Sequence, residues 1–108
     1  VLAYPVISMT EPWGHSGSRK NLLGDNPDPE LAKSLSNDLM VTAQTPPTFL
    51  FHTQEDVGVP SENSVAFFAA CLKHKVPAEL HVYQFGPHGV GLAPGDEALS
   101  TWKDRLHQ

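Results

Sequence analysis

The sequence has little of three features that would point to a disulfide-braced, nucleic-acid-binding or membrane-spanning protein. Its 108 residues include one cysteine, Cys71, so neither an internal disulfide nor a cysteine-based zinc site can form within it. Seven Lys and Arg face 12 Asp and Glu, giving a net charge of −5, and no basic cluster exists to bind the phosphates of a nucleic acid. No apolar run approaches the roughly 20 residues that cross a bilayer. What is left is one ordinary globular domain, 40% hydrophobic and 18% charged.

What is present is an alternation of apolar strands and helical segments. Runs of β-branched and apolar residues predict strands at Val1–Met9, Thr48–Thr53 and Ala78–Phe85. The near-continuous apolarity of the second run is typical of a strand buried on both faces of a parallel sheet. Ser61–Lys75 predicts a helix, with Ser61 as its N-cap. The apolar residues at helical spacing in this segment are Val65, Phe68, Ala69, Leu72 and Val76.

The segments between these elements are shorter or irregular. Thr10–Pro29 is rich in Gly and Pro and predicts a long loop, with one turn at Arg19–Leu23. Asp28-Pro29 predicts the start of a short helix that ends near Leu35.

A last helix is predicted over Asp96–His107, with Leu99, Trp102 and Leu106 facing inward. Strands that alternate with helices imply a parallel sheet with crossover helices. The expected fold class is therefore α/β, with about three parallel strands.

Two titratable residues follow predicted strands and are candidates for chemistry. Asp56 comes in the loop after Thr48–Thr53, and His88 comes in the Gly- and Pro-rich loop after Ala78–Phe85. Functional groups of open parallel sheets lie just beyond the carboxyl ends of the strands. A carboxylate that orients an imidazole makes up two thirds of a hydrolytic Ser-His-Asp triad. The spacing therefore predicts that Asp56 and His88 meet at one edge of the sheet.

Other roles are open for these residues. Glu55 is a rival acid beside Asp56, Asp56 could simply cap a turn, and His88 could be a turn residue. His52 lies within a buried-strand run and is interpreted as a structural hydrogen-bonding residue. Cys71 lies in an apolar helical stretch, which favours a buried thiol.

A regular spacing of histidines invites a metal-site interpretation. His74, His81 and His88 are seven residues apart, but they fall on a helix end, a strand and a loop. Zinc ligands must converge in space, so no metal site is predicted from this spacing.

Several segments carry a resemblance to a known family: HTQEDVGVP, SENSVAFFAACLKHKVP, AELHVYQF and GPHGVGL, with AYPVISM and GSRKNLLG upstream. Together they resemble the C-terminal part of α/β-hydrolase esterases. The nearest branch is that of acetylxylan and feruloyl esterases, which is related to dienelactone hydrolases and prolyl oligopeptidases. The resemblance covers nearly the whole chain. It implies that Asp56, of D-x-x-V-P, is the triad acid, that His88, of G-x-H-G, is the triad base, and that no metal or organic cofactor is needed.

The family's nucleophile is a serine in G-x-S-x-G, on a sharp turn between a strand and a helix. The nearest match, Gly14-His15-Ser16-Gly17-Ser18, lacks the final glycine. No strand leads directly into it, and residues 17–47 contain no convincing strand. Ser16 is therefore not expected to be the nucleophile.

These observations predict that residues 1–108 are a partial α/β-hydrolase domain, a C-terminal segment that carries the acid and base without the serine. The open sheet edge beside Val1–Met9 would be covered by the remainder of the domain or by self-association. The expected function is that of a segment of a serine esterase, inactive alone, acting on a small ester or an acylated saccharide. A non-catalytic βα binding module and part of a prolyl-oligopeptidase-like peptidase are the alternatives. Localisation is left open, because any signal peptide would lie upstream of Val1.

Overall fold

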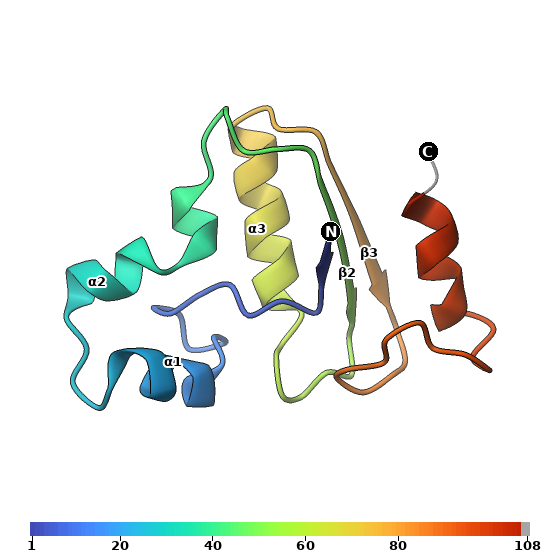
Figure 1. Ribbon diagram of the computed structural model, residues 1–108, viewed down its shortest axis with the longest axis horizontal. Coiled ribbons are helices and arrows are strands. Elements are labelled where there is room, and N and C mark those ends of the chain that lie inside the picture. The colour runs from blue at the N-terminus through green and yellow to red at the C-terminus, as the bar shows by residue number, and fades with distance from the viewer. Residues whose placement is uncertain (107–108) are drawn as a thin grey trace.

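A computed structural model describes residues 1–106, and in this range it contains a three-stranded parallel sheet in the order β1-β2-β3. The strands are β1 (Leu2–Ala3), β2 (Thr48–Thr53) and β3 (Ala78–Tyr83). Figure 1 shows them side by side, with helices in the connections between them. The predicted α/β class with three parallel strands is confirmed.

The connections between strands contain four helical segments within residues 1–106: α1 (Ser16–Leu23), α2 (Pro29–Ser34), the 3₁₀ helix η1 (Asn37–Met40) and α3 (Glu62–Lys73). A fifth, the 3₁₀ helix η2 (Leu99–Leu106), follows β3. None of the helices in this described part of the chain is long and apolar enough to traverse a bilayer. The α3 helix joins β2 to the neighbouring parallel strand β3, as a crossover helix must.

The two faces of the sheet are covered by different helices (Figure 1). On one face, α3 encloses the main apolar cluster, made of Ile7, Val41, Leu50, Phe67, Cys71 and Val76. On the other face, Trp102 of η2 stacks on Phe51 of β2 with ring centroids 4.6 Å apart. Cys71 is fully buried, as predicted, and burial raises the pKa of its thiol.

The first strand is much shorter than the predicted Val1–Met9, because the chain leaves the sheet after Ala3. Tyr4 adopts a positive φ of 38°, which is rare for a residue with a side chain and incompatible with a continuing strand. Pro5 follows and has no N–H to donate to a neighbouring strand. Together these two residues end β1.

Beyond β1, side chains rather than a strand satisfy the backbone of residues 7–9. Asn63 Oδ1 accepts hydrogen bonds from the N–H groups of Ile7 (2.9 Å) and Ser8 (3.1 Å). Ser36 Oγ accepts the N–H of Met9 at 2.9 Å. Apolar content alone predicted a strand here, but these buried polar side chains compete for the same donors.

The helix predicted over Ser61–Lys75 is present as α3, and of the apolar residues at helical spacing Val76 is buried in the main apolar cluster and Phe68 packs against it. Val65 and Leu72 are 48% and 60% exposed. The buried residues are Asn63, Ser64, Phe67 and Cys71. The helix is turned in this way because its two buried polar residues make hydrogen bonds to the segments beneath them, described below.

The short helices begin where local capping chemistry permits. Asp28 caps α2 as predicted, its carboxylate accepting the N–H of Glu30 at 3.0 Å. The turn predicted at Arg19–Leu23 is a longer helix, α1, because His15 caps it by accepting the N–H of Ser18 through Nδ1 at 3.1 Å.

The last predicted elements are also shorter than expected. The third strand ends at Tyr83 rather than Phe85, and the helix predicted over Asp96–His107 is the 3₁₀ helix η2. Leu99 and Trp102 are buried as predicted, whereas Leu106 is 37% exposed. His107 lies outside the described residues.

Candidate active site

Asp56 lies in the loop that follows β2, and the backbone of that loop fixes its carboxylate. The Oδ1 atom accepts hydrogen bonds from the N–H groups of Gly58 (3.1 Å) and Val59 (2.8 Å). The Asp56 side chain is 0% exposed. One carboxylate oxygen is thus occupied by the backbone, which leaves Oδ2 for other partners.

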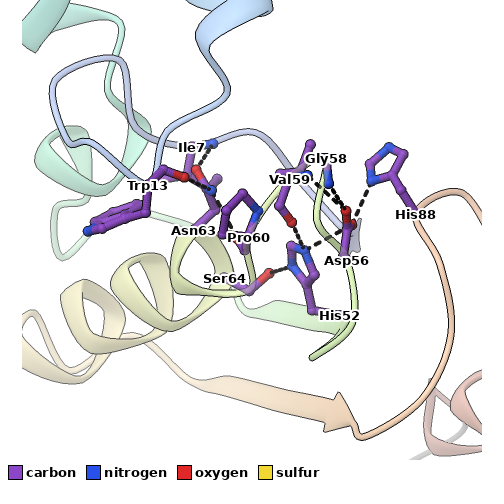
Figure 2. A network of polar contacts seen from close by, with 10 residues as sticks. All are labelled: Ile7, Trp13, His52, Asp56, Gly58, Val59, Pro60, Asn63, Ser64 and His88. Carbon is purple, nitrogen blue, oxygen red and sulfur yellow. Dashed lines mark hydrogen bonds and ion pairs between the residues drawn. The ribbon is translucent and has the colours of Figure 1, made fainter.

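His88 follows β3 and meets that second oxygen. Its Nδ1 lies 2.6 Å from Asp56 Oδ2, and Figure 2 shows the two side chains facing one another across the two loops. Because an ionised carboxylate can only accept, Nδ1 carries the proton. Within residues 1–106, Nε2 has no hydrogen-bond partner, and the side chain is 44% exposed. The structure brings the two predicted residues together and leaves Nε2 able to accept a proton from outside.

The surroundings of Asp56 keep it ionised. Burial by itself would raise its pKa, but the hydrogen bonds from Val59 N–H and from His88, together with favourable electrostatic interactions with the His88 and His52 rings, outweigh that effect. The pKa of Asp56 therefore lies below its ordinary value of 3.8.

This lowered pKa predicts an acid-dependent loss of stability that Asp56→Asn abolishes. The pKa of the Asp56 carboxyl is lower in the folded than in the unfolded state. Its contribution to the free energy of unfolding is therefore complete at pH values above the unfolded-state pKa of 3.8, and it disappears as the pH falls through the folded-state pKa. Denaturant unfolding of the wild type and of Asp56→Asn, from neutral to strongly acid pH, measures this pH dependence of stability. We expect the difference in the free energy of unfolding to narrow below pH 3.8; a difference that stays constant with pH would contradict the assignment.

His52 is fully buried and supports the Asp56 loop from below (Figure 2). Its Nε2 lies 2.7 Å from the carbonyl oxygen of Val59, which can only accept, so Nε2 carries the proton. Its Nδ1 then accepts the hydroxyl proton of Ser64 at 2.7 Å. The interpretation of His52 as a structural hydrogen-bonding residue is confirmed. Its Nε2 also lies 3.4 Å from Asp56 Oδ2, a contact that was not predicted from the sequence.

Asn63 joins three segments around the site. Besides the two backbone groups that its Oδ1 accepts from, its Nδ2 donates to the carbonyl oxygens of Trp13 and Pro60, both at 3.0 Å. In Figure 2 the Trp13 indole points away from His88. Sequence reasoning missed Asn63; the available signal was an amide side chain in the first turn of an otherwise apolar helix.

Glu55, the rival acid, has a different partner. Its Oε2 accepts the N–H of Gly86 at 3.1 Å, which ties the loop after β3 to the loop after β2. Gly86 has a φ of 124°, and a Cβ there would lie 2.8 Å from Leu99 Cδ1, so glycine is required. Asp56, not Glu55, contacts the imidazole.

The remaining candidates lie elsewhere. Ser16 is the exposed first residue of α1, preceded by a loop, and no hydrogen bond in the described chain joins it to His88. His74 follows α3 and His81 lies on β3 beside Glu79. Among residues 1–106, no three His, Cys, Asp or Glu side chains are grouped as metal ligands would be.

The chain is similar in sequence and structure to proteins that are named as hydrolases. The chain is 40% identical over 102 residues to endo-1,4-beta-xylanase B of Butyrivibrio fibrisolvens, covering 94% of this chain and 16% of that protein. It is 34% identical over 96 residues to the acetylxylan esterase of Xylanibacter ruminicola, covering 85% of this chain and 20% of that protein. The acetyl ester-xyloside bifunctional hydrolase of Caldicellulosiruptor lactoaceticus superposes with a TM-score of 0.93 at 50% identity, covering 97% of this chain and 38% of that structure.

The chain thus spans about a fifth or less of these two sequence relatives and less than half of the solved structure. The family model described as the prolyl oligopeptidase family matches residues 3–102, which is almost the entire chain. With its parallel sheet and crossover helices, the chain belongs to the prolyl oligopeptidase family of α/β-hydrolases.

Proposed function

We propose that this chain supplies the acid and the base of a Ser-His-Asp triad in a serine carboxylic-ester hydrolase. The observation that carries the proposal is the 2.6 Å contact between His88 Nδ1 and a buried Asp56 carboxylate whose other oxygen is held by two backbone N–H groups. Such an arrangement fixes the tautomer of the imidazole and stabilises the imidazolium.

The same geometry supports a complete acyl-transfer cycle. His88 Nε2 takes the proton of a serine hydroxyl as its oxygen attacks the ester carbonyl, and then gives that proton to the departing alcohol. In the second half, Nε2 takes a proton from the water that attacks the acyl-enzyme, and it returns that proton to the serine oxygen as the acyl–oxygen bond breaks and the carboxylic acid leaves. Asp56 stays ionised throughout and stabilises the charged ring.

The serine is proposed to come from outside these 108 residues. Ser16 has no contact with His88 in the described chain, and β1 pairs with β2 along one side. Beside β1 lies an apolar hollow of about 360 Å³, lined by Leu2, Pro5, Val6, Ile7, Asn37, Met40, Val41 and Phe67. An apolar hollow next to a strand edge supports coverage by further protein, either the remainder of a hydrolase domain or a second copy.

The substrate is proposed to be an acetyl ester on a saccharide. Two of the similar proteins are named for acetylxylan and for an acetyl ester-xyloside. The acyl-transfer cycle proposed above uses no cofactor. A second candidate is peptide-bond hydrolysis, which the description of the matched family favours. The acid and base serve both reactions equally, so the choice depends on substrate assays.

The test compares this chain alone with the longest natural polypeptide that contains it. Each is assayed on an acetylated nitrophenol, on acetylated xylo-oligosaccharides and on a chromogenic prolyl peptide, and is labelled with a fluorophosphonate that reacts with activated serines. We expect ester hydrolysis and labelling of a serine outside residues 1–108 in the longer protein alone. Activity of the short chain would point to Ser16, peptide hydrolysis alone would favour the peptidase, and inactivity of both would favour a non-catalytic binding module.

A further inference from the structure

Besides Asp56, His88 has a second neighbour, Tyr4, which is near the N-terminal end of the chain. The two rings are 4.8 Å apart between centroids, at an interplanar angle of 67°. His88 stands in a loop flanked by glycines and is nearly half exposed. A single hydrogen bond to a carboxylate oxygen does not by itself fix the orientation of an imidazole, and the Tyr4 ring supplies a second contact to it.

The position of Tyr4 depends on its unusual backbone. Leu2 packs against the α3 side of the sheet, while Ala3 is paired with Phe51 of β2. Because side chains alternate along a strand, Tyr4 would return to the α3 side if β1 continued. Its φ of 38° breaks the alternation, and its ring instead lies 5.5 Å from Phe51. A strained conformation at a site of this kind is a pointer to function.

Tyr4 is itself held by the core. Its N–H donates to the carbonyl oxygen of Phe51 at 2.8 Å, and Phe51 is fully buried and stacked on Trp102. The Trp102 indole N–H donates to the carbonyl oxygen of Gly91 at 2.9 Å, only three residues beyond His88. Rings and hydrogen bonds therefore form a closed path that leaves His88 through Tyr4 and returns to its own loop through Trp102.

We propose that Tyr4 is a positioning residue for His88, which holds the imidazole with Nδ1 on Asp56 and Nε2 turned outward. The proposal rests on the function proposed above and extends it to a residue that follows β1, whereas Asp56 follows β2 and His88 follows β3. The contact is made by the ring: no hydrogen bond to the Tyr4 hydroxyl is present in the described chain.

Three variants of the full natural protein separate the ring from the backbone. Tyr4→Phe keeps the ring, and we expect its kcat to be close to that of the wild type. Tyr4→Asn removes the ring but tolerates a positive φ, so the protein should fold. We expect its kcat to fall by about 10²-fold, with little change in KM. Tyr4→Leu should lose as much activity as Tyr4→Asn. It should also be less stable than Tyr4→Asn, because leucine disfavours the positive φ of residue 4 more than asparagine does.

A spectroscopic readout tests the position of His88 without relying on activity. The proton between His88 Nδ1 and Asp56 gives a downfield ¹H NMR signal, which His88→Ala identifies by its loss. We expect this signal in the wild type and in Tyr4→Phe, and its broadening or loss in folded Tyr4→Asn. An unchanged signal and kcat in Tyr4→Asn would overturn the proposal. Normal activity of His88→Ala would instead refute the proposed triad. Even then, the NMR signal in Tyr4→Asn would show whether Tyr4 holds His88 against Asp56.

Discussion

His88→Ala in the full natural protein is expected to lower kcat for acetyl-ester hydrolysis by roughly 10⁶-fold. Alanine leaves no group that can take the serine proton or return it to the leaving alcohol. The unprotonated Nε2 of His88 has no other partner within residues 1–106, so no neighbouring base can replace it there. Steady-state kinetics on an acetylated nitrophenol measure the effect.

The matched control is His74→Ala, which removes an exposed histidine at the end of α3. We expect wild-type kinetics for this variant. Both variants should retain the circular-dichroism spectrum of the wild type, because His88 is nearly half exposed. A His88→Ala protein within tenfold of wild-type kcat would rule out a base role for this residue.

Asp56→Asn is expected to lower kcat by roughly 10⁴-fold. The amide is close in size to the carboxylate and can still accept the two backbone N–H groups through its oxygen. Its NH₂ group would then face His88 Nδ1 as a donor, which moves the ring proton to Nε2 and leaves no acceptor for the serine proton. The loss thus arises from the wrong tautomer as well as from the missing charge.

Asp25→Asn provides the control for this substitution, since Asp25 is exposed and paired only with Lys20 at 3.5 Å. It should leave kcat and the pH dependence of stability unchanged. If Asp56→Asn kept near-normal turnover while remaining folded, Asp56 would be a structural acid that caps its loop.

The elements that sequence predicts well are those whose signals are local. The bounds of β2 follow from a short run with an apolar centre, Phe49–Phe51, between Pro47 and Gln54, and the start of α2 follows from Asp28-Pro29. The meeting of an acidic loop with the His88 loop follows from topology, because each loop comes just after one of two adjacent parallel strands, whereas the choice of Asp56 over Glu55 followed from the spacing and the family resemblance. No knowledge of side-chain packing is needed for any of these.

The features that sequence misses depend on distant partners. Residues 7–9 have strand-like composition, but a helix amide and a serine hydroxyl take their backbone donors. The buried face of α3 is only partly predictable from hydrophobicity. Asn63 turns inward to accept the N–H groups of Ile7 and Ser8, and Ser64 turns inward to donate to His52 Nδ1. Tyr4 was likewise invisible as a neighbour of His88, since only its positive φ places the ring on that face.

The crossover from β2 through α3 to β3 carries the acid at one end and the base at the other. If related genes recombine at a breakpoint on either side of this β2-α3-β3 unit, the Asp56 loop and the His88 loop are inherited together from one parent. A breakpoint inside α3 would combine an acid loop from one parent with a base loop from another. Chimeras within the family should therefore tolerate exchange at the borders of this unit better than exchange within it.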